Sequence, residues 1–247
     1  MIGNTLIELD RVDSTNEYAN RMLNRDDLDD GVVIWAYDQY SGKGQQQHAW
    51  QSEAGKNLTL TVILKPWFLS PDRQFQLNKA ITLGVVDFIR KSLGSVPVSI
   101  KWPNDIYLGS LKVGGILIEN RILGNRLEYA LVGIGLNINQ ITFDGALPNP
   151  ISMIHHLRHE MKLREALHSL LISLDLRYRK LVQDESADLD EEFNQNLFGF
   201  GQWRRFSKGN EPFEGRIRGV DECGRLCIET GDGEILCFHH KEVEYIL

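Results

Sequence analysis

The stretch Lys101-Trp102-Pro103-Asn104-Asp105, followed by Lys112-Val113-Gly114-Gly115-Ile116-Leu117-Ile118-Glu119, concentrates chemically active side chains. It predicts a strand edge that carries a lysine, an asparagine and an aspartate into a turn. A second strand then begins at another lysine, just before a glycine pair. Burying such charged groups is costly unless a ligand meets them. The alternative is an ordinary hairpin with solvated lysines.

The segment Gly133-Ile134-Gly135-Leu136-Asn137-Ile138-Asn139 has two glycines inside an apolar strand. Glycine weakens a strand, so we expect another group to approach the backbone closely there. The apolar periodicity of the rest of the body predicts both strands and helices. We expect strands at 5–12, 31–37, 58–64, 99–102, 112–119 and 127–138, and helices at 14–23, from 70 onward and around 163–174.

Several neighbouring strands of this body have connections too short for a crossover helix, which favours antiparallel pairing. After about Gly199 the pattern of residues changes: glycines separate short β-prone runs at 213–217, 225–229 and 234–238. The sequence therefore predicts an α+β fold, a mixed sheet with helices, followed by a small β-barrel. We expect two domains, 1–198 and 199–247.

Composition excludes several classes of protein. The chain has 247 residues, with Lys+Arg 27 and Asp+Glu 34, and a net charge of −7 at pH 7. This acidic balance argues against broad nucleic-acid binding, and a hydrophobic content of 42% excludes disorder as a description of the whole chain. No apolar run approaches the roughly 18 residues of a membrane helix. The start lacks a signal-peptide pattern, so the expected compartment is cytoplasmic.

Cys223, Cys227 and Cys237 are an odd number of cysteines and do not make a disulfide framework. Together with His239 and His240 they suggest zinc, but their spacing lacks a second matched pair. We therefore expect Cys227 and Cys237 to be buried strand residues, and the sequence assigns no metal ligands.

Two polar segments each have a structural and a functional interpretation. Ser14 with Glu17 fits a capping box, but the hydroxyls of Ser14 and Thr15 would also make a socket for a neutral ligand rich in hydrogen-bonding groups. The loop 39–50 has glycines on both sides of Lys43, which suits a phosphate, although its spacing is not that of a Walker A loop. A plain surface loop is the alternative.

In their order and spacing, these segments resemble those of biotin protein ligases, also called biotin–[acetyl-CoA-carboxylase] ligases, over nearly the whole chain. The K-W-P-N-D segment followed by K-x-x-G-I-L is the most specific feature. The resemblance implies a catalytic domain like that of biotin ligases and class II synthetases, followed by an SH3-like β-barrel. We expect a ligase only, without a DNA-binding helix-turn-helix, because the residues before Thr5 leave no room for one.

The resemblance implies ATP-dependent protein biotinylation. Biotin would be activated to biotinyl-5′-AMP with release of pyrophosphate, and then transferred to a specific lysine of a carrier. Biotin and ATP would be the substrates, with Mg²⁺ beside the leaving pyrophosphate. The implied partner is a biotin carboxyl carrier protein or a biotin-dependent carboxylase subunit, with no DNA and no membrane. The ligase would be a monomer or a homodimer.

The resemblance also implies roles for individual residues. Both reactants are anionic, so cations must bring them together. The catalytic residues would be Lys112, as the strongest candidate, Lys43 and Asp105. The biotin-binding residues would be Ser14, Thr15, Asn16, Gln39, Gly42, Lys43, Gly44, Gln45, Lys112, Gly115, Gly133 and Gly135. The ATP- or adenylate-binding residues would be Lys43, Gln45, His48, Trp50, Lys101, Asn104, Lys112 and Asn137.

The loop departs from the family's usual G-R-G-R-x-G-x-x-W, since it reads Gly42-Lys43-Gly44-Gln45-Gln46-Gln47-His48-Ala49-Trp50. Lys43 keeps a charge but lacks the guanidinium fork, and Gln45 removes a charge, which predicts weaker retention of the adenylate. Two alternatives stay open. One is a lipoate ligase or octanoyltransferase, against which the segments Lys101 to Asp105 and Gly115-Ile116-Leu117 favour biotin. The other is a non-catalytic biotin- or adenylate-binding sensor, which would not obviously need Lys112.

Overall fold

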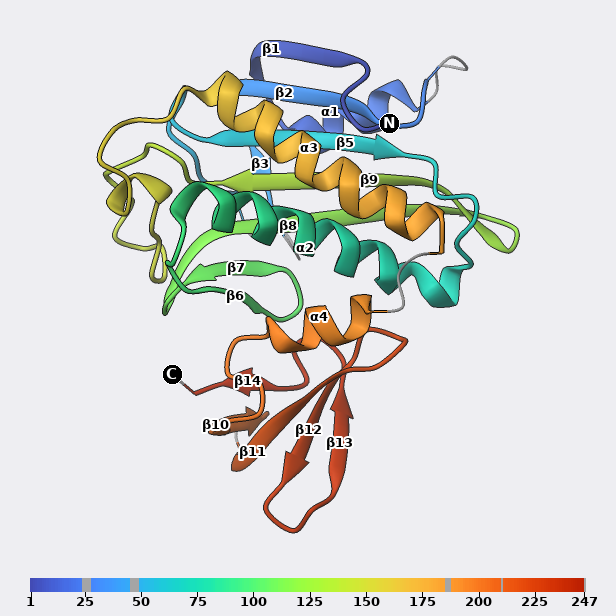
Figure 1. The fold of residues 1–247 in the computed structure, drawn as a ribbon, viewed down its shortest axis with the longest axis vertical. Coiled ribbons are helices and arrows are strands. Elements are labelled where there is room, and N and C mark those ends of the chain that lie inside the picture. The colour runs from blue at the N-terminus through green and yellow to red at the C-terminus, as the bar shows by residue number, and fades with distance from the viewer. Residues whose placement is uncertain (24–27, 45–48, 185–187, 210, 247) are drawn as a thin grey trace.

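The computed structural model describes residues 1–23, 28–44, 49–184, 188–209 and 211–246 (Figure 1). None of the helices in these ranges combines the length and the apolar character needed to cross a membrane. In chain order the elements are β1 (Leu6–Val12), α1 (Thr15–Met22), β2 (Val32–Gln39), β3 (Gly42–Lys43), β4 (Ala49–Trp50), β5 (Leu58–Leu64), η2 (Pro71–Arg73), α2 (Gln74–Leu93), β6 (Val98–Lys101), β7 (Asp105–Leu108), β8 (Leu111–Leu123), β9 (Arg126–Leu136), η3 (Met153–His155), α3 (Leu163–Val182), α4 (Leu189–Gln195), β10 (Trp203–Lys208), β11 (Glu211–Val220), β12 (Leu226–Thr230), β13 (Ile235–Phe238) and β14 (Glu244–Tyr245).

A seven-stranded sheet forms the body of the molecule, in the order β1-β2-β5-β9-β8-β7-β6. β1 and β2 are parallel, with α1 as the crossover between them. The other neighbouring pairs are antiparallel. The predicted mixed sheet with helices is confirmed.

The two faces of this sheet differ because successive side chains of a strand point to opposite sides. On one face, residues such as Leu60 join the main core, which α2 and α3 cover (Figure 1). On the other face, Ile63 packs against Ala19 of α1. Thr59 and Thr61 share that second face and are buried. The fold therefore has an apolar face and a partly polar face on one sheet.

A second sheet of five antiparallel strands follows, in the order β13-β12-β11-β10-β14. Phe206, Ile217 and Ile228 are fully buried in its core. The five antiparallel strands are consistent with the predicted SH3-like fold. The edge strands of this sheet are β13 and β14. The helix α4 leads into the second sheet and contacts α2. Its Asp190 accepts a 2.8 Å hydrogen bond from the buried Lys79 ammonium of α2.

Short elements account for most differences from the sequence-based prediction. The helix expected from residue 70 begins as the turn η2, and its α-helical part starts at Gln74. α4 occupies a segment predicted only as polar and acidic. Its acidic first turn complements the positive end of the helix dipole. β7 has only four residues, too few for a hydrophobic period to identify.

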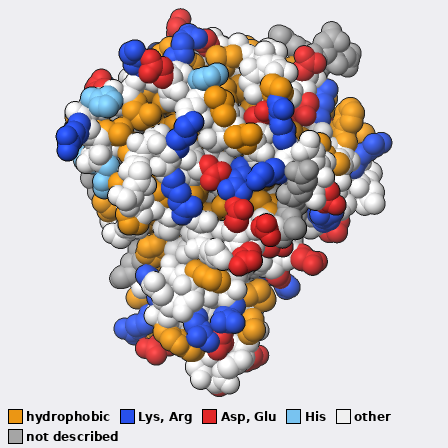
Figure 2. All heavy atoms as spheres, in the orientation of Figure 1, with side chains coloured by type: hydrophobic (Ala, Val, Ile, Leu, Met, Phe, Trp, Pro, Cys, Tyr) orange, Lys and Arg blue, Asp and Glu red, His pale blue; other side chains and the backbone are white. Residues whose placement is uncertain are grey.

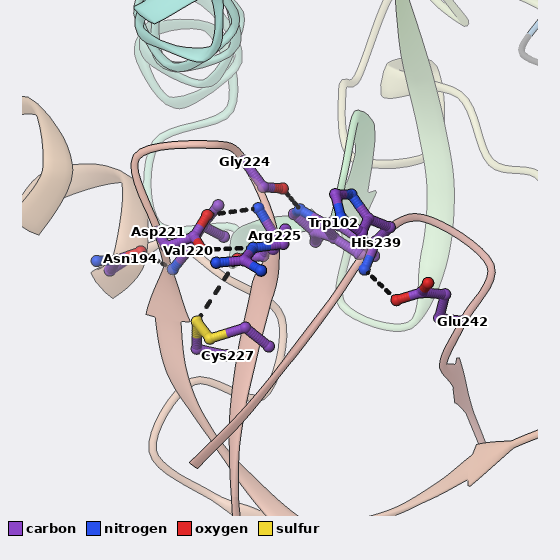
Figure 3. Close-up of a disulfide and its surroundings, with 10 residues drawn as sticks. Trp102, Asn194, Val220, Asp221, Gly224, Arg225, Cys227, His239 and Glu242 are labelled. Carbon is purple, nitrogen blue, oxygen red and sulfur yellow. Dashed lines mark hydrogen bonds and ion pairs between the residues drawn. A yellow bond between two sulfur atoms is a disulfide. The ribbon is translucent and has the colours of Figure 1, made fainter. Parts of the chain in front are cut away.

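Cys227 and Cys237 lie in strands, as predicted, but the prediction that they are buried is wrong. The two residues lie directly opposite each other on β12 and β13, are only partly buried, and form a disulfide (Figure 3). Opposite positions on adjacent antiparallel strands bring two sulfurs within bonding reach. Hydrophobic runs identify such strands but leave their register undetermined, which is why the pairing was not predicted.

Close packing of α2 on α3 gives a test of the core. A Cβ built on Gly84 of α2 would lie 3.0 Å from the Cδ2 atom of Leu174 of α3, which is fully buried. We expect Leu174→Ala to lower the free energy of unfolding by about 2–5 kcal/mol, because it leaves a cavity between the helices. The matched control is Leu176→Ala on the same helix, since Leu176 is 59% exposed. Urea denaturation measures both, and equal losses would contradict the packing described.

Candidate active site

An irregularity in the sheet brings the lysine and the aspartate of the motif together. The register of β7 and β8 shifts after Ile106, and Tyr107 pairs with Lys112, so Val113 is an extra residue in the ladder. This bulge turns Lys112 away from the core face, where regular alternation would put it. Its ammonium lies 2.7 Å from a carboxylate oxygen of Asp105, and both side chains stay about a third exposed (30% and 27%).

A cavity of about 770 Å³ opens over this ion pair, between the two sheets. Most of the predicted site residues line it. They are Ser14, Thr15, Asn16, Gln39, Lys43, Gly44, Trp50, Lys101, Asn104, Asp105, Lys112, Gly115, Gly133, Gly135 and Asn137. Gly42 lies behind this lining, paired with Trp50 in the β3–β4 ladder. Gln45 and His48 fall outside the described residues.

Ser14 caps α1, as one of its two interpretations predicts, but the capping box is only half formed. The Ser14 hydroxyl accepts the Glu17 N–H at 3.5 Å. The Glu17 carboxylate pairs with the Lys43 ammonium instead of returning to Ser14, whose N–H is bound by Asp13 at 2.8 Å. Hydrogen bonding from Arg21 holds the pKa of Asp13 down to about 2, so this carboxylate stays charged.

A buried polar network extends from Ser14 along the wall of the cavity. The N–H and the hydroxyl of Thr15 lie 2.9 and 3.1 Å from the Gln39 Oε1 atom. The Asn16 amide donates to Glu119 at 2.7 Å and accepts from the Thr61 hydroxyl at 2.5 Å. Thr15, Asn16 and Thr61 are at most 4% exposed. These groups are therefore held in fixed positions before any ligand arrives.

The close approach predicted at the glycine pair of β9 is confirmed, and the approaching groups are side chains of this chain. A Cβ built on Gly133 would lie 2.5 Å from the Asn16 Oδ1 atom, and one on Gly135 would overlap the Trp50 indole. Gly115 differs, because the nearest atom to its built Cβ is 3.4 Å away. Two of the three glycines therefore make room for the site's own side chains.

Lys101 lies at the opposite end of the cavity from this network. Its ammonium sits over the rings of Tyr107 and Tyr245, 5.4 Å from each centroid. Burial lowers the pKa of Lys101 and raises the pKa of Tyr107 to about 12. The site therefore has a half-buried cation between two neutral rings.

The second sheet completes the cavity. The Trp102 indole donates a 3.0 Å hydrogen bond to the Gly224 carbonyl (Figure 3), and the His240 ring meets the Trp102 ring edge-on at 5.9 Å. Burial lowers the pKa of His240, which favours its neutral form. The lining from this sheet comprises His240, Lys241, Val243, Glu244 and Tyr245.

These second-sheet residues, together with Thr61 and Glu119, were not identified from the sequence. Thr61 had a signal, because polar threonines alternate with apolar residues in β5, a strand buried throughout. Glu119 closes the predicted strand but has no local feature of a site. The second-sheet residues are far in sequence from the motifs they join, and no local pattern predicts such contacts.

Some polar atoms of the cavity wall have no partner within the described part of the chain. They include the Trp50 indole N–H, the Asn137 Oδ1 atom and the Tyr245 hydroxyl, all buried. The Asn137 amide nitrogen, by contrast, donates to the Ile151 carbonyl at 3.0 Å. Buried polar groups without partners are rare in folded proteins. A ligand with donors and acceptors can satisfy them.

Two further features bear on the class of site. Figure 2 shows basic and acidic side chains interspersed over the visible face. Among the described residues, Asp221, Cys227 and Cys237 bring metal-ligand atoms within 4.8 Å of one another. Their two sulfurs, however, are bonded to each other in the disulfide.

Comparisons with known proteins give the class of protein that this fold and cavity define. Residues 8–137 match the model of the biotin/lipoate A/B protein ligase family, and residues 205–243 match the biotin protein ligase C-terminal domain. The chain belongs to the biotin/lipoate A/B protein ligase family, and it is a ligase.

Relatives within the family are biotin ligases. The bifunctional ligase/repressor BirA of Escherichia coli is 34% identical over 247 residues, covering 94% of this chain and 71% of that protein. A biotin–[acetyl-CoA-carboxylase] ligase of Paracoccus denitrificans is 27% identical, covering 91% and 94%. The biotin protein ligase of Aquifex aeolicus in complex with biotin and ATP has the same fold, with a TM-score of 0.80, 24% identity and coverage of 98% and 100%.

The contrast between Gly135 and Gly115 gives a test of the site geometry. We expect Gly135→Ala to displace the Trp50 ring and to lower the free energy of unfolding by about 1–3 kcal/mol, because the new methyl group overlaps the indole. Gly115→Ala is the matched control, since its methyl group has ordinary contacts. The ¹⁹F resonance of Trp50 in 5-fluorotryptophan-labelled protein, assigned with Trp50→Phe, reports the displacement. An unmoved resonance in Gly135→Ala would refute the contact.

Proposed function

We propose that the chain is an ATP-dependent biotin protein ligase, which forms biotinyl-5′-AMP and then transfers biotin to a lysine of a biotin carboxyl carrier domain. One observation carries this proposal. Along the polar face of the large sheet, the lining changes from mainly neutral hydrogen-bonding groups beside β5, to the Asp105–Lys112 pair, to Lys101 on β6. That gradient suits a ligand pair that is neutral at one end and anionic at the other.

The neutral end is proposed to hold biotin. Ser14, Thr15, Asn16 and Gln39 would meet the ureido ring, whose donors and acceptor each cost about 1–3 kcal/mol if buried without a partner. Thr61 would keep Asn16 and Thr15 in place through its hydroxyl. The three glycines Gly115, Gly133 and Gly135 would border the ring and its chain, together with Gly44 of the loop. Gly42 would act through Trp50, with which it pairs.

In the first step, a carboxylate oxygen of biotin attacks the α-phosphorus of ATP. The bond from that phosphorus to the bridging oxygen breaks, and pyrophosphate leaves. Lys112 would exchange Asp105 for the oxygens of the transferring group and stabilise their charge. Lys101 would face the leaving pyrophosphate, and Lys43 the loop side of the adenylate.

The nucleotide would meet the remaining predicted residues. Trp50 is proposed to stack near the adenine, with Asn104 and Asn137 facing the nucleotide. The unpartnered Oδ1 atom of Asn137 supports this role, because it can accept a hydrogen bond from a ligand. Gln45 and His48 are also proposed to bind the adenylate.

In the second step, the amine of the carrier lysine attacks the acyl carbon of biotinyl-5′-AMP. The amide bond forms, the acyl–phosphate bond breaks, and AMP leaves. The amine must lose a proton in this step. Asp105 is proposed to orient the amine and accept that proton, because its carboxylate lies on the cavity wall beside Lys112. The carrier domain of acetyl-CoA carboxylase is the first acceptor to test, since the Paracoccus relative is named for it.

Mg²⁺ is proposed to enter with ATP. This ion is usually held by one or two carboxylates together with substrate phosphates, and the cavity lining offers Asp105 and Glu244. The ion would neutralise charge on the leaving pyrophosphate. The lipoate alternative is less favoured, because the match of residues 205–243 is to a domain of biotin protein ligases.

Biotin-dependent exchange between ATP and radiolabelled pyrophosphate tests the first step. We expect exchange with biotin and Mg²⁺, and none with lipoate or octanoate. Lys112→Ala should lower the rate about 10²–10⁴-fold, because it removes the cation nearest the transferring group. Lys162→Ala is the control, since Lys162 is an exposed lysine paired with Glu165 elsewhere on the surface.

Other results of this assay would redirect the proposal. Exchange with lipoate or octanoate in place of biotin would move the chain to the lipoate branch. Biotin binding without any exchange would refute the ligase and favour a sensor. Full activity of Lys112→Ala would remove Lys112 from the mechanism while leaving the ligase activity intact.

A further inference from the structure

The cation at the β6 end of the cavity is held by both sheets. Lys101 belongs to the large sheet and lies over Tyr107 of β7, whose hydroxyl is 3.5 Å from the ammonium. The second ring over it, Tyr245, comes from β14 of the small sheet. The Lys101 ammonium is therefore one of the points at which the two sheets meet at the cavity.

Lys101 differs from Lys112 in its electrostatic surroundings. Lys112 has a carboxylate partner at 2.7 Å, whereas no carboxylate of the described residues lies within ion-pair distance of the Lys101 ammonium. Asp105 and Glu244 act on it only at longer range, and Lys112 opposes its charge. The negative faces of two aromatic rings hold a cation in place without neutralising it. A half-buried cation of this kind is poised for an anionic ligand.

The hydroxyl of Tyr245 is not explained by any contact among the described residues. Its hydroxyl is buried and without a hydrogen-bond partner among the described residues. Its ring also packs against Phe206 of the same sheet, at 5.3 Å between centroids. The ring, rather than the hydroxyl, is thus the part of Tyr245 that makes the contacts with Lys101 and with the small sheet.

We propose that Tyr245 is a positioning residue, which holds Lys101 against Tyr107 so that its ammonium meets the β- and γ-phosphates of the nucleotide. This inference rests on the proposed function, because it assigns the cationic end of the cavity to ATP. The location supports it: Lys101 lies on the edge strand β6, whereas the buried neutral network that would take the biotin ring lies beside β5. The polyphosphate is the most highly charged part of either substrate, and Lys101 is a cation at that far end.

Calorimetric titration with the magnesium complexes of α,β-methylene-ATP and of AMP tests the proposal without requiring catalysis. We expect Tyr245→Leu and Lys101→Ala each to weaken binding of the ATP analogue about tenfold, the size of a lost cation–ring or cation–phosphate contact. Binding of AMP should change less than about twofold, because AMP lacks the β- and γ-phosphates. Tyr245→Phe keeps the ring and should therefore keep the preference for the ATP analogue over AMP.

Two controls separate positioning from a general structural role. The double variant should bind the ATP analogue no worse than Lys101→Ala alone, because Tyr245 acts through Lys101. Phe213→Leu removes another ring from the same sheet, one stacked on Phe206 at 5.7 Å, and should leave the preference for the ATP analogue over AMP unchanged.

The proposal would be overturned if the two single effects multiplied in the double variant, or if AMP and the ATP analogue lost affinity equally. It would also be overturned if Phe213→Leu weakened binding of the ATP analogue, relative to AMP, as much as Tyr245→Leu does. Failure of biotin-dependent exchange with these nucleotide results intact would refute the proposed ligase reaction and leave the role of Tyr245 standing. Intact biotin-dependent exchange, together with losses of affinity that multiply in the double variant, would support the ligase reaction and refute the role of Tyr245.

Discussion

The extra residue in β8, Val113, is the constraint on which the site depends. Regular alternation along β8 would put Lys112 on the apolar face, beneath α2 and α3, where an unpaired ammonium would be very costly. The bulge lets Val113 fill that position in the core and turns Lys112 toward the cavity. The backbone of Lys112 is then fixed by the segment beyond β9, through hydrogen bonds of 2.7 Å to Asn149 and 2.9 Å from Ile151. A single inserted residue thus converts a core strand into one edge of a reactive site.

The rest of the site follows from the period of two in the sheet. Lys101, Asp105 and Gly115 share one face because they pair across β6, β7 and β8, and Gly135 continues that face on β9. Side chains of the opposite parity pack into the core. The protein therefore places its polar, ligand-facing groups on one face of a sheet whose other face is apolar. Packing of the core on that other face holds the strands of the site in position.

Much of this arrangement could be predicted from the sequence. Hydrophobic periodicity identifies the long strands and helices, and the glycines of β9 indicate the close approach that Asn16 and Trp50 make. The motif residues were predicted as one site, and the structure brings most of them around one cavity.

The parts that could not be predicted depend on register and on long-range contacts. The bulge at Val113 is invisible to a pattern count, because both Lys112 and Val113 read as ordinary strand residues. The disulfide depends on the pairing of β12 with β13, and Tyr245 reaches Lys101 only after both sheets have formed. Tertiary structure decides these features, whereas local sequence decides only the elements that carry them.

The cavity joins residues from Ser14 to Tyr245, and this span has a consequence for the timing of synthesis. Ribosomes make a chain from its N-terminus, so the large sheet can begin to fold while the small sheet is still being made. The cavity wall, however, is incomplete until residue 245 has been translated and has docked. A growing chain would therefore hold its polar threonines and its lysines in a half-open groove, and the full binding site would be formed only after the small sheet has been made and has docked.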